Sequence, residues 1–244
     1  SISDININDL LIENANFNLN HKNYNFFLHL LKNNFLDNEL KIKNSNIFYR
    51  NLKKDVLFIN KITNMKYYYD NKELKNLIIS KNELFNFPYE IKISDDIDKK
   101  KITSIINLNY FKLKIENEFD YNNDIKKGHV NIINNKSKSN IFYETNLKFF
   151  NFTFKDKIEN PNYSYIGKIN VNPFYSSFEG EAQKINLSYL FDINSLVPQI
   201  IKTGILNNEK IDFELNIKAK NVFENINLKS LNLNSKIKEG LIDI

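Results

Sequence analysis

Every second residue is apolar in the stretch Phe213-Glu214-Leu215-Asn216-Ile217-Lys218-Ala219. Successive side chains along a β-strand point to opposite faces of the sheet, so this spacing gives one apolar and one polar face. The same period of two recurs along the whole chain. Clear instances are residues 40–42, 111–115, 119–121, 226–228 and 231–233, and further strand candidates are residues 5–7, 17–19, 47–49, 56–59, 91–93, 102–108, 130–133, 141–154 and 166–171.

The fold class follows from this alternation. Strands of a parallel sheet covered on both faces read as continuous Val, Ile and Leu runs, whereas alternation is typical of antiparallel sheets with one solvated face. Helical spacing is found only in residues 24–35 and 194–204. The sequence therefore predicts a mainly all-β protein with a long, curved, mostly antiparallel meandering sheet and one or two short helices. No Pro-, Gly- or Ser-rich linker interrupts it, so residues 1–244 are expected to form a single continuous β-rich region.

The apolar face of such a sheet must be hidden from water. Two short helices are too few to cover a dozen strands, so the sheet either folds into a closed sandwich or curls into a trough with an apolar wall. A trough suits acyl chains, because each buried methylene contributes about 0.8 kcal/mol and needs no directional partner. Periodicity alone leaves the sandwich and the trough equally open.

Composition and charge exclude several classes of protein. The chain has 244 residues, no Cys, 34 Lys and Arg, 29 Asp and Glu, and a net charge of +5. The lack of Cys excludes disulfides, thiolate metal sites and cysteine nucleophiles. The lysines are scattered among acidic residues, and Arg, which nucleic-acid readout favours, occurs only at Arg50, so no nucleic-acid partner is expected.

No arrangement of residues predicts catalysis. His21, His29 and His129 lie far apart, and no metalloprotease, nucleotide-binding or serine-hydrolase motif is present. Residues 95–98 (Asp-Asp-Ile-Asp) precede three lysines and are interpreted as a solvated turn rather than a cation site. Glu179 and Glu181 are expected to share one face of a strand, where the two carboxylates repel each other. We therefore expect no enzymatic activity, no cofactor and no metal.

A longer segment resembles a known family. Residues 162–174 read Asn-Tyr-Ser-Tyr-Ile-Gly-Lys-Ile-Asn-Val-Asn-Pro-Phe, which is similar to a strand–Gly–strand–Pro-Phe passage of bacterial AsmA-like proteins. A Leu-rich stretch, the second helix candidate and a strand pair then follow in the family's carboxy-terminal order, at residues 185–191, 194–204, 211–219 and 222–233, closing with residues 236–244. Upstream, residues 24–35, 40–49 and 56–62 are similar to the family's helix–strand–turn–strand unit, so the likeness spans most of the chain.

The resemblance implies a periplasmic protein, anchored to the bacterial inner membrane in its full-length form. Such a protein shields or transports phospholipid between the inner and outer membranes and supports outer-membrane assembly. Its sheet forms an apolar trough, and the implied partners are phospholipid acyl chains and envelope membrane proteins. The chain starts at Ser1 rather than Met and ends in the apolar residues 241–244, so we expect a fragment whose membrane association lies outside it.

The groove wall is expected to be built from the apolar members of the clearest alternating strands. These are Phe111, Leu113, Ile115, Ile169, Val171, Phe213, Leu215, Ile217, Ile226 and Leu228. For each of them, ordinary core packing is the equally open alternative.

Two other functions compete with lipid binding. The first is a closed β-sandwich that serves as a structural or interaction module of the cell envelope without lipid cargo, and full burial of Phe111 and Phe213 would favour it. The second is a polysaccharide-binding or hydrolytic protein, which requires a cleft with converging carboxylates.

Overall fold

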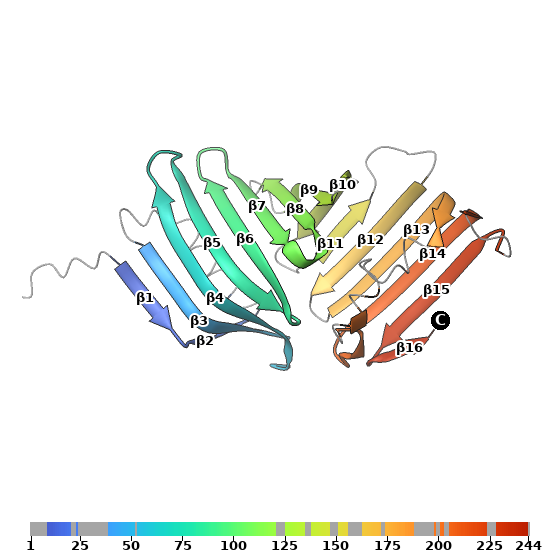
Figure 1. Ribbon diagram of the computed structural model, residues 1–244, viewed down its shortest axis with the longest axis horizontal. Coiled ribbons are helices and arrows are strands. Elements are labelled where there is room, and N and C mark those ends of the chain that lie inside the picture. The colour runs from blue at the N-terminus through green and yellow to red at the C-terminus, as the bar shows by residue number, and fades with distance from the viewer. Residues whose placement is uncertain are drawn as a thin grey trace, which may run out of the picture. The chain divides into compact units, whose positions relative to one another are not determined.

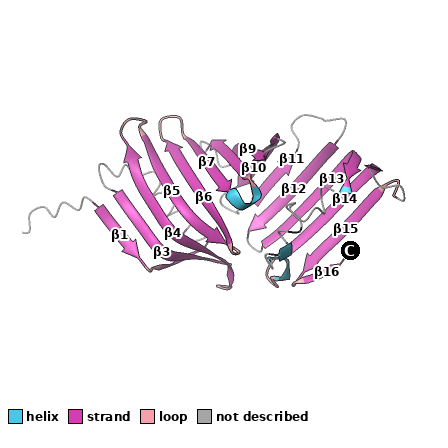
Figure 2. Cartoon of the chain, in the orientation of Figure 1, coloured by secondary structure: helices cyan, strands magenta, loops and turns pink. Residues whose placement is uncertain are grey.

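The computed structural model describes residues 9–20, 23, 39–51, 53–120, 125–134, 138–146, 151–155, 163–171, 174–187, 198, 201–202, 205–223 and 228–243. Strands make up 78% of the structure and form large, curved, mostly antiparallel sheets that do not close on themselves (Figure 1). Among the residues described, helix is almost absent (Figure 2). The predicted all-β class is therefore confirmed.

The chain divides into two compact units. Unit 1 comprises residues 1–123 and 131–138, and unit 2 comprises residues 124–130 and 139–244. The division falls within β9 (Ile125–Asn134) and at the start of β10 (Lys138–Asn146), so a chain without a Pro- or Gly-rich linker still forms two units.

The described strands of unit 1 form a single-layer meander in which β3 to β8 pair antiparallel in sequence order. Two short strands pair parallel with β3 at one edge, β1 beside its first half and β2 beside its second half. The elements are β1 (Asp9–Glu13), β2 (Asn16–Leu19), β3 (Glu39–Arg50), β4 (Val56–Asp70), β5 (Lys75–Leu84), β6 (Phe87–Asp96), β7 (Lys101–Leu108), the short 3-10 helix η1 (Asn109–Phe111) and β8 (Leu113–Asp120).

The edge of this sheet is irregular at a seam between β1 and β2, at residues 14–15 and 44–45. Asn14 and Asn44 adopt left-handed backbone conformations, with φ of 56° and 47°, which Asn tolerates better than most residues. Ser45 is 1% exposed, and its hydroxyl accepts the N–H of Ala15 at 3.0 Å and donates to the carbonyl of Lys43 at 2.8 Å. The Ser45 hydroxyl therefore satisfies the N–H of Ala15, while backbone bonds from Asn14 to Lys43 and from Asn46 to Ala15 continue the ladder on either side.

Unit 2 is also a meander, with one parallel step. Strands β10 to β13 and β14 to β16 pair antiparallel in sequence order, whereas β13 and β14 pair in parallel. A parallel pair needs a long connection, and within residues 187–211 Pro198, Ile201 and Lys202 are helical. The other elements are β11 (Asn151–Lys155), β12 (Tyr163–Val171), β13 (Phe174–Asn186), the 3-10 helix η2 (Ile205–Asn207), β14 (Asp212–Phe223), β15 (Leu231–Lys238) and β16 (Leu241–Asp243).

In both units the strands separate apolar from charged side chains. The most buried apolar residues on the apolar face are Ile42, Tyr49, Ile62, Tyr67 and Ile102 in unit 1 and Ala219 and Ile237 in unit 2. Leu57 and Leu77 of unit 1 are buried on the opposite face, which otherwise carries mostly charged and polar residues. The one-sided pattern predicted from the sequence is present in each sheet.

Several predicted elements have different bounds in the structure. Residues 40–42 and 47–49 belong to one strand, β3, and residues 141–154 contain two strands, β10 and β11. The predicted strand at residues 5–7 and the predicted helix at residues 24–35 lie outside the described residues, as does most of the predicted helix at residues 194–204.

Candidate functional site

Five of the predicted groove residues belong to β12 and β14 of unit 2, and four of them lie on its apolar face. Phe213, Leu215 and Ile217 alternate along β14, between β13 and β15. Three rows of paired residues cross the sheet on this face, and each ends on β15. The first row is Ile169, Ser176, Phe213 and Ile237. The second is Phe178, Leu215 and Ser235, and the third is Gly180, Ile217 and Leu233. The structure therefore joins residues from four strands into one continuous apolar surface.

The middle of this surface is only partly hidden from water. Phe213, Leu215 and Ile217 are all half-buried. Side chains sealed between two packed sheets form a closed core. Half-burial at three successive inward positions instead leaves this part of the apolar face accessible to water.

Small residues shape the same surface. A Cβ atom on Gly180 would lie 3.0 Å from the ring of Phe178, and that ring stacks on Tyr165 with centroids 6.2 Å apart. The glycine thus lets the Phe178 ring lie close to the backbone of its own strand. On this surface, large apolar side chains therefore lie beside the small residues Ser176, Gly180 and Ser235.

The predicted groove residues of unit 1 gather at the β7–β8 connection. Leu113 and Ile115 lie opposite Leu108 and Ile106 and are half-buried. Phe111 was predicted to begin this strand, which is wrong, because it ends η1 and Lys112, with φ of 50°, turns the chain before β8 begins. The Phe111 ring is nevertheless half-buried and lies 4.9 Å from that of Phe87.

Three predicted groove residues are not placed on either surface. Val171 pairs through its backbone with Phe174, but its side chain lies outside the described part of the chain, as does the whole of Ile226. Leu228 is 43% exposed and lies in no strand, so the strand predicted at residues 226–228 is wrong at this residue.

The sequence did not single out the most deeply buried part of the unit 1 face. Ile62 is 2% exposed, Tyr67 is 4% exposed and Ile42 is 7% exposed. The register of β4 against β5 shifts just after Ile62, and this bulge breaks the period of two on which the prediction relied.

Asp95 lies within the apolar face of unit 1 and is only 1% exposed. The predicted solvated turn at residues 95–98 is wrong for this residue, which belongs to β6 and lies opposite Asn76 and Ile102. Burial, together with the charge of Asp95, raises the pKa of the Tyr67 hydroxyl. The turn itself begins at Asp96, whose carboxylate accepts the N–H of Lys99 at 3.0 Å, and this bond lowers the pKa of Asp96.

The opposite face of unit 1 carries cross-strand ion pairs. Lys66 of β4 lies 3.0 Å from Glu39 of β3, and Lys81 of β5 lies 3.4 Å from Glu90 of β6. Two lysines donate to the Glu39 carboxylate, Lys41 above all, and they lower its pKa. This face is therefore suited to water, which leaves the apolar face as the candidate ligand surface.

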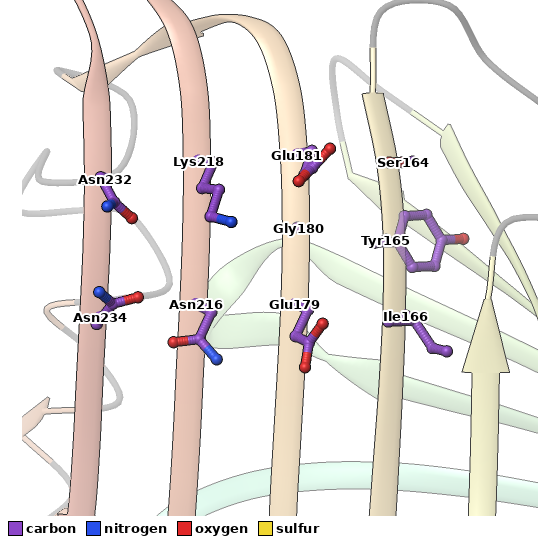
Figure 3. A pocket seen from close by; sticks show the side chains of 10 residues that line it. All are labelled: Ser164, Tyr165, Ile166, Glu179, Gly180, Glu181, Asn216, Lys218, Asn232 and Asn234. Carbon is purple, nitrogen blue, oxygen red and sulfur yellow. The ribbon is translucent and has the colours of Figure 1, made fainter.

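The polar face of unit 2 contains a hollow of about 740 Å³ (Figure 3). Glu179 and Glu181 lie on this face together, as predicted, and both are exposed. Within the described residues Glu181 lies opposite Lys218 without an ion pair, whereas Glu214, further along β14, reaches Lys236 at 3.9 Å. The two rows that line the hollow are Ser164, Glu181, Lys218 and Asn232, and Ile166, Glu179, Asn216 and Asn234.

The described residues hold no group of three or more His, Asp or Glu side chains placed to bind a metal ion. None of their helices has the length and apolar character that crossing a membrane requires. The ring of His129 lies 6.1 Å from that of Phe142, so this histidine packs against an aromatic residue.

Comparisons of the chain with protein-family models, with curated proteins and with solved structures each find no match. A function for this chain is therefore inferred from the physical character of its two faces.

Proposed function

We propose that this protein binds phospholipid acyl chains on its apolar faces, foremost on the β12–β15 face of unit 2. The observation that carries the proposal is the half-burial of Phe213, Leu215 and Ile217 on a curved single-layer sheet. Apolar side chains that their own layer does not cover favour an apolar ligand, because removing both surfaces from water contributes about 25 cal/mol for each Å².

The chemistry of this surface supports an acyl chain over a polar ligand. Its rows are built from aliphatic and aromatic side chains, interrupted by Ser176, Ser235 and Gly180. Such a surface offers few directional partners, and a methylene chain needs none. Each methylene that leaves water contributes about 0.8 kcal/mol, so affinity is expected to rise with the length of acyl chain that the surface covers.

In this proposal the protein is an AsmA-like component of the bacterial periplasm that shields or transports phospholipid between the two membranes. The sequence resemblance supports this location, together with an inner-membrane anchor and envelope membrane proteins as partners. The separation of apolar and ion-paired faces is compatible with a protein that carries lipid through an aqueous compartment.

The first experiment tests for bound lipid. The chain, expressed in bacteria and purified without detergent, is expected to carry phospholipid that native mass spectrometry and lipid extraction detect. A correctly folded, monodisperse preparation without lipid, which also fails to take up a fluorescent fatty acid, would count decisively against the proposal.

The second experiment places the ligand on one face. Leu215→Asp puts a charge at the middle of the β14 row, and it is expected to weaken fatty-acid uptake at least about tenfold, which corresponds to roughly 1.4 kcal/mol. Asn216→Asp adds the same charge to the neighbouring position on the opposite face and serves as the matched control. Equal effects of the two substitutions would contradict binding on the apolar face.

The polar hollow supports a second candidate function, the binding of a polyhydroxylated ligand such as a glycan. Its lining offers amide, carboxylate and ammonium groups on neighbouring strands, and Glu181 and Lys218 are not engaged with each other. Isothermal titration with soluble peptidoglycan fragments, compared between the parent and a Glu181→Gln, Lys218→Gln double variant, tests this candidate. Binding that the double variant retains in full would exclude the hollow.

A further inference from the structure

Aromatic side chains lie in two of the three connections at one end of the unit 1 sheet. Because neighbouring strands alternate in direction, the β3–β4, β5–β6 and β7–β8 connections lie at one end of the sheet, and the β4–β5 and β6–β7 connections lie at the other (Figure 1). The first end has aromatic residues in or beside its connections. We call this set the aromatic rim: Phe58, Phe85, Phe87, Tyr110 and Phe111.

The rim consists of two groups of neighbouring rings, and Tyr110 forms its exposed tip. The ring of Phe85 lies 6.3 Å from that of Phe58, and the ring of Phe87 lies 4.9 Å from that of Phe111. Tyr110 contacts both Phe87 and Phe111, at 6.0 and 5.2 Å, yet its side chain is 63% exposed. The connections at the opposite end, residues 71–74 and 97–100, contain no aromatic residue and are mostly charged or polar.

The β5–β6 connection holds an aromatic residue where the backbone disfavours one. Phe85 and Asn86 have φ of 49° and 63°, so this two-residue turn has the left-handed geometry that usually selects Asn and Gly. Bulky residues are rare in this region, and the conformation costs about 1–2 kcal/mol. A strained position that retains a large apolar side chain at a turn is a reason to look for a binding role.

The connections at this end also contain basic residues. Lys53, Lys54 and Lys112 lie in the connections at the same end and are exposed. The acidic residue of these connections, Asp55, is engaged by Asn51, whose amide nitrogen lies 3.2 Å from the Asp55 carboxylate. This end therefore presents both aromatic rings and exposed lysines.

We propose that the aromatic rim docks unit 1 onto the surface of a bilayer that contains anionic phospholipid. Aromatic rings favour the headgroup region of a bilayer, and exposed lysines near an anionic leaflet add an attraction that salt screens. The docking goes beyond acyl-chain binding. Phe111 belongs both to the rim and to the predicted groove of unit 1, but docking does not require the foremost acyl site, which is the apolar face of unit 2.

The absence of Trp from the chain provides a direct probe. Tyr110→Trp places a single indole at the tip of the rim. Its emission is expected to shift to shorter wavelength with vesicles of phosphatidylcholine and phosphatidylglycerol, and to be quenched by brominated acyl chains. Leu74→Trp, at a position 57% exposed at the opposite end of the sheet, is the matched control and is expected to show neither change.

The outcomes separate docking from the alternatives. No response of the Tyr110→Trp variant, the same response from the Leu74→Trp variant, or an equal response with phosphatidylcholine alone would each overturn the proposal. Binding of the rim to an acidic protein but not to anionic vesicles would overturn it as well.

Two variants test the contributions of charge and of the strained turn. Lys53→Glu with Lys54→Glu is expected to weaken vesicle binding by roughly fivefold or more for each lysine and to reduce its salt dependence. Phe85→Gly relieves the left-handed strain, so the fold is expected to persist while vesicle binding falls. Unchanged binding by a folded Phe85→Gly variant would contradict a role for the rim.

Docking and acyl capture can fail independently. Leu215→Asp is expected to lose fatty-acid uptake and to bind anionic vesicles like the parent, whereas the lysine variant is expected to keep fatty-acid uptake. Loss of vesicle binding in Leu215→Asp would show that the vesicle signal reports acyl capture, and it would overturn docking through the rim.

Discussion

Unit 1 and unit 2 are built from the same kind of alternating strand, yet they bury their apolar faces to different degrees. In unit 1 the centre of the face is sealed, with Ile62 2% exposed and Tyr67 4% exposed. In unit 2 the interior strand β14 leaves Leu215 and Ile217 half-buried, although Ala219 of the same strand is 4% exposed. Alternation therefore determines which residues share a face, and it leaves open how completely that face is covered. The incompletely covered face is the better candidate for a ligand.

The polar faces differ in a related way. The described acidic and basic side chains of β3 to β6 are largely engaged with each other, as in the contacts of Glu39 with Lys41 and Lys66. The hollow of unit 2 instead keeps Glu181 and Lys218 apart although they lie directly opposite each other. Paired charges satisfy one another, whereas unengaged groups remain available to a polar ligand.

The largest expected effect is a difference in stability between Asp substitutions on the apolar faces of the two units. Ile62→Asp introduces a charge at a fully buried position and is expected to unfold unit 1, because an unpaired buried charge costs at least about 3 kcal/mol. Leu215→Asp is expected to leave unit 2 folded, because its half-buried position lets water reach the carboxylate. Hydrogen exchange, resolved by peptide, measures both units within the whole chain. Equal destabilisation by the two substitutions would remove the distinction between the units.

A buried hydroxyl should also matter more in unit 1 than in unit 2. Ser45→Ala removes the group that accepts from Ala15 and donates to Lys43, and it is expected to cost about 1–3 kcal/mol. Ser235→Ala, at a half-buried serine of β15, is the control and is expected to be nearly neutral. Denaturant unfolding gives the free energies, and faster exchange at Ala15 identifies the edge that is released. A neutral Ser45→Ala would show that water replaces the hydroxyl.

Alkaline pH should destabilise unit 1 through its buried tyrosines. Burial raises the pKa of Tyr67 and of Tyr89 above the usual value near 10. A raised pKa means that the folded state favours the neutral phenol. This stability is therefore complete below pH 10 and is lost as the pH rises toward the folded-state pKa. In denaturant titrations followed by circular dichroism, Tyr67→Phe is expected to flatten the loss above pH 10, and an unaltered slope would refute this assignment.

The smallest expected effect concerns the ion pairs. Glu39→Gln removes the carboxylate that Lys41 and Lys66 approach, at 2.8 and 3.0 Å. The lowered pKa of Glu39 means that its contribution is present above pH 4.5 and is lost as the pH falls through the folded-state value. Because the pairs face solvent, the loss is expected to be well below that of Ser45→Ala and to vanish at high salt. A larger, salt-independent loss would indicate a buried role.

The alternating strands were largely predictable, and the failures have identifiable causes. β14 and β15 follow their patterns closely, whereas β5 was missed because Leu77, Ile78 and Ile79 form a continuous run without alternation. β13 was missed because the positions on its apolar face include Ser176 and Gly180, which are not apolar side chains and so interrupt the alternating pattern. Phe111 was assigned to a strand because a 3-10 turn at a strand end preserves the spacing of its apolar residues.

Part of the candidate site was beyond the reach of any pattern along the chain. Phe178 joins the row of Leu215 only through the parallel pairing of β13 with β14, which brings together segments separated by a long connection. Asp95 was read as solvated because charged residues are usually exposed, yet the register places it opposite Asn76 inside an apolar face. The aromatic rim likewise unites turns that are far apart in sequence.

The sequence by itself determined that this protein is built from strands with one apolar and one polar face, because the side-chain period of a strand is a local property of the backbone. Only the tertiary structure decided which strands pair, which parts of each face are sealed and which remain half-open, and which turns meet at one end of a sheet. Those properties depend on register and on contacts between distant segments, and no local period encodes them.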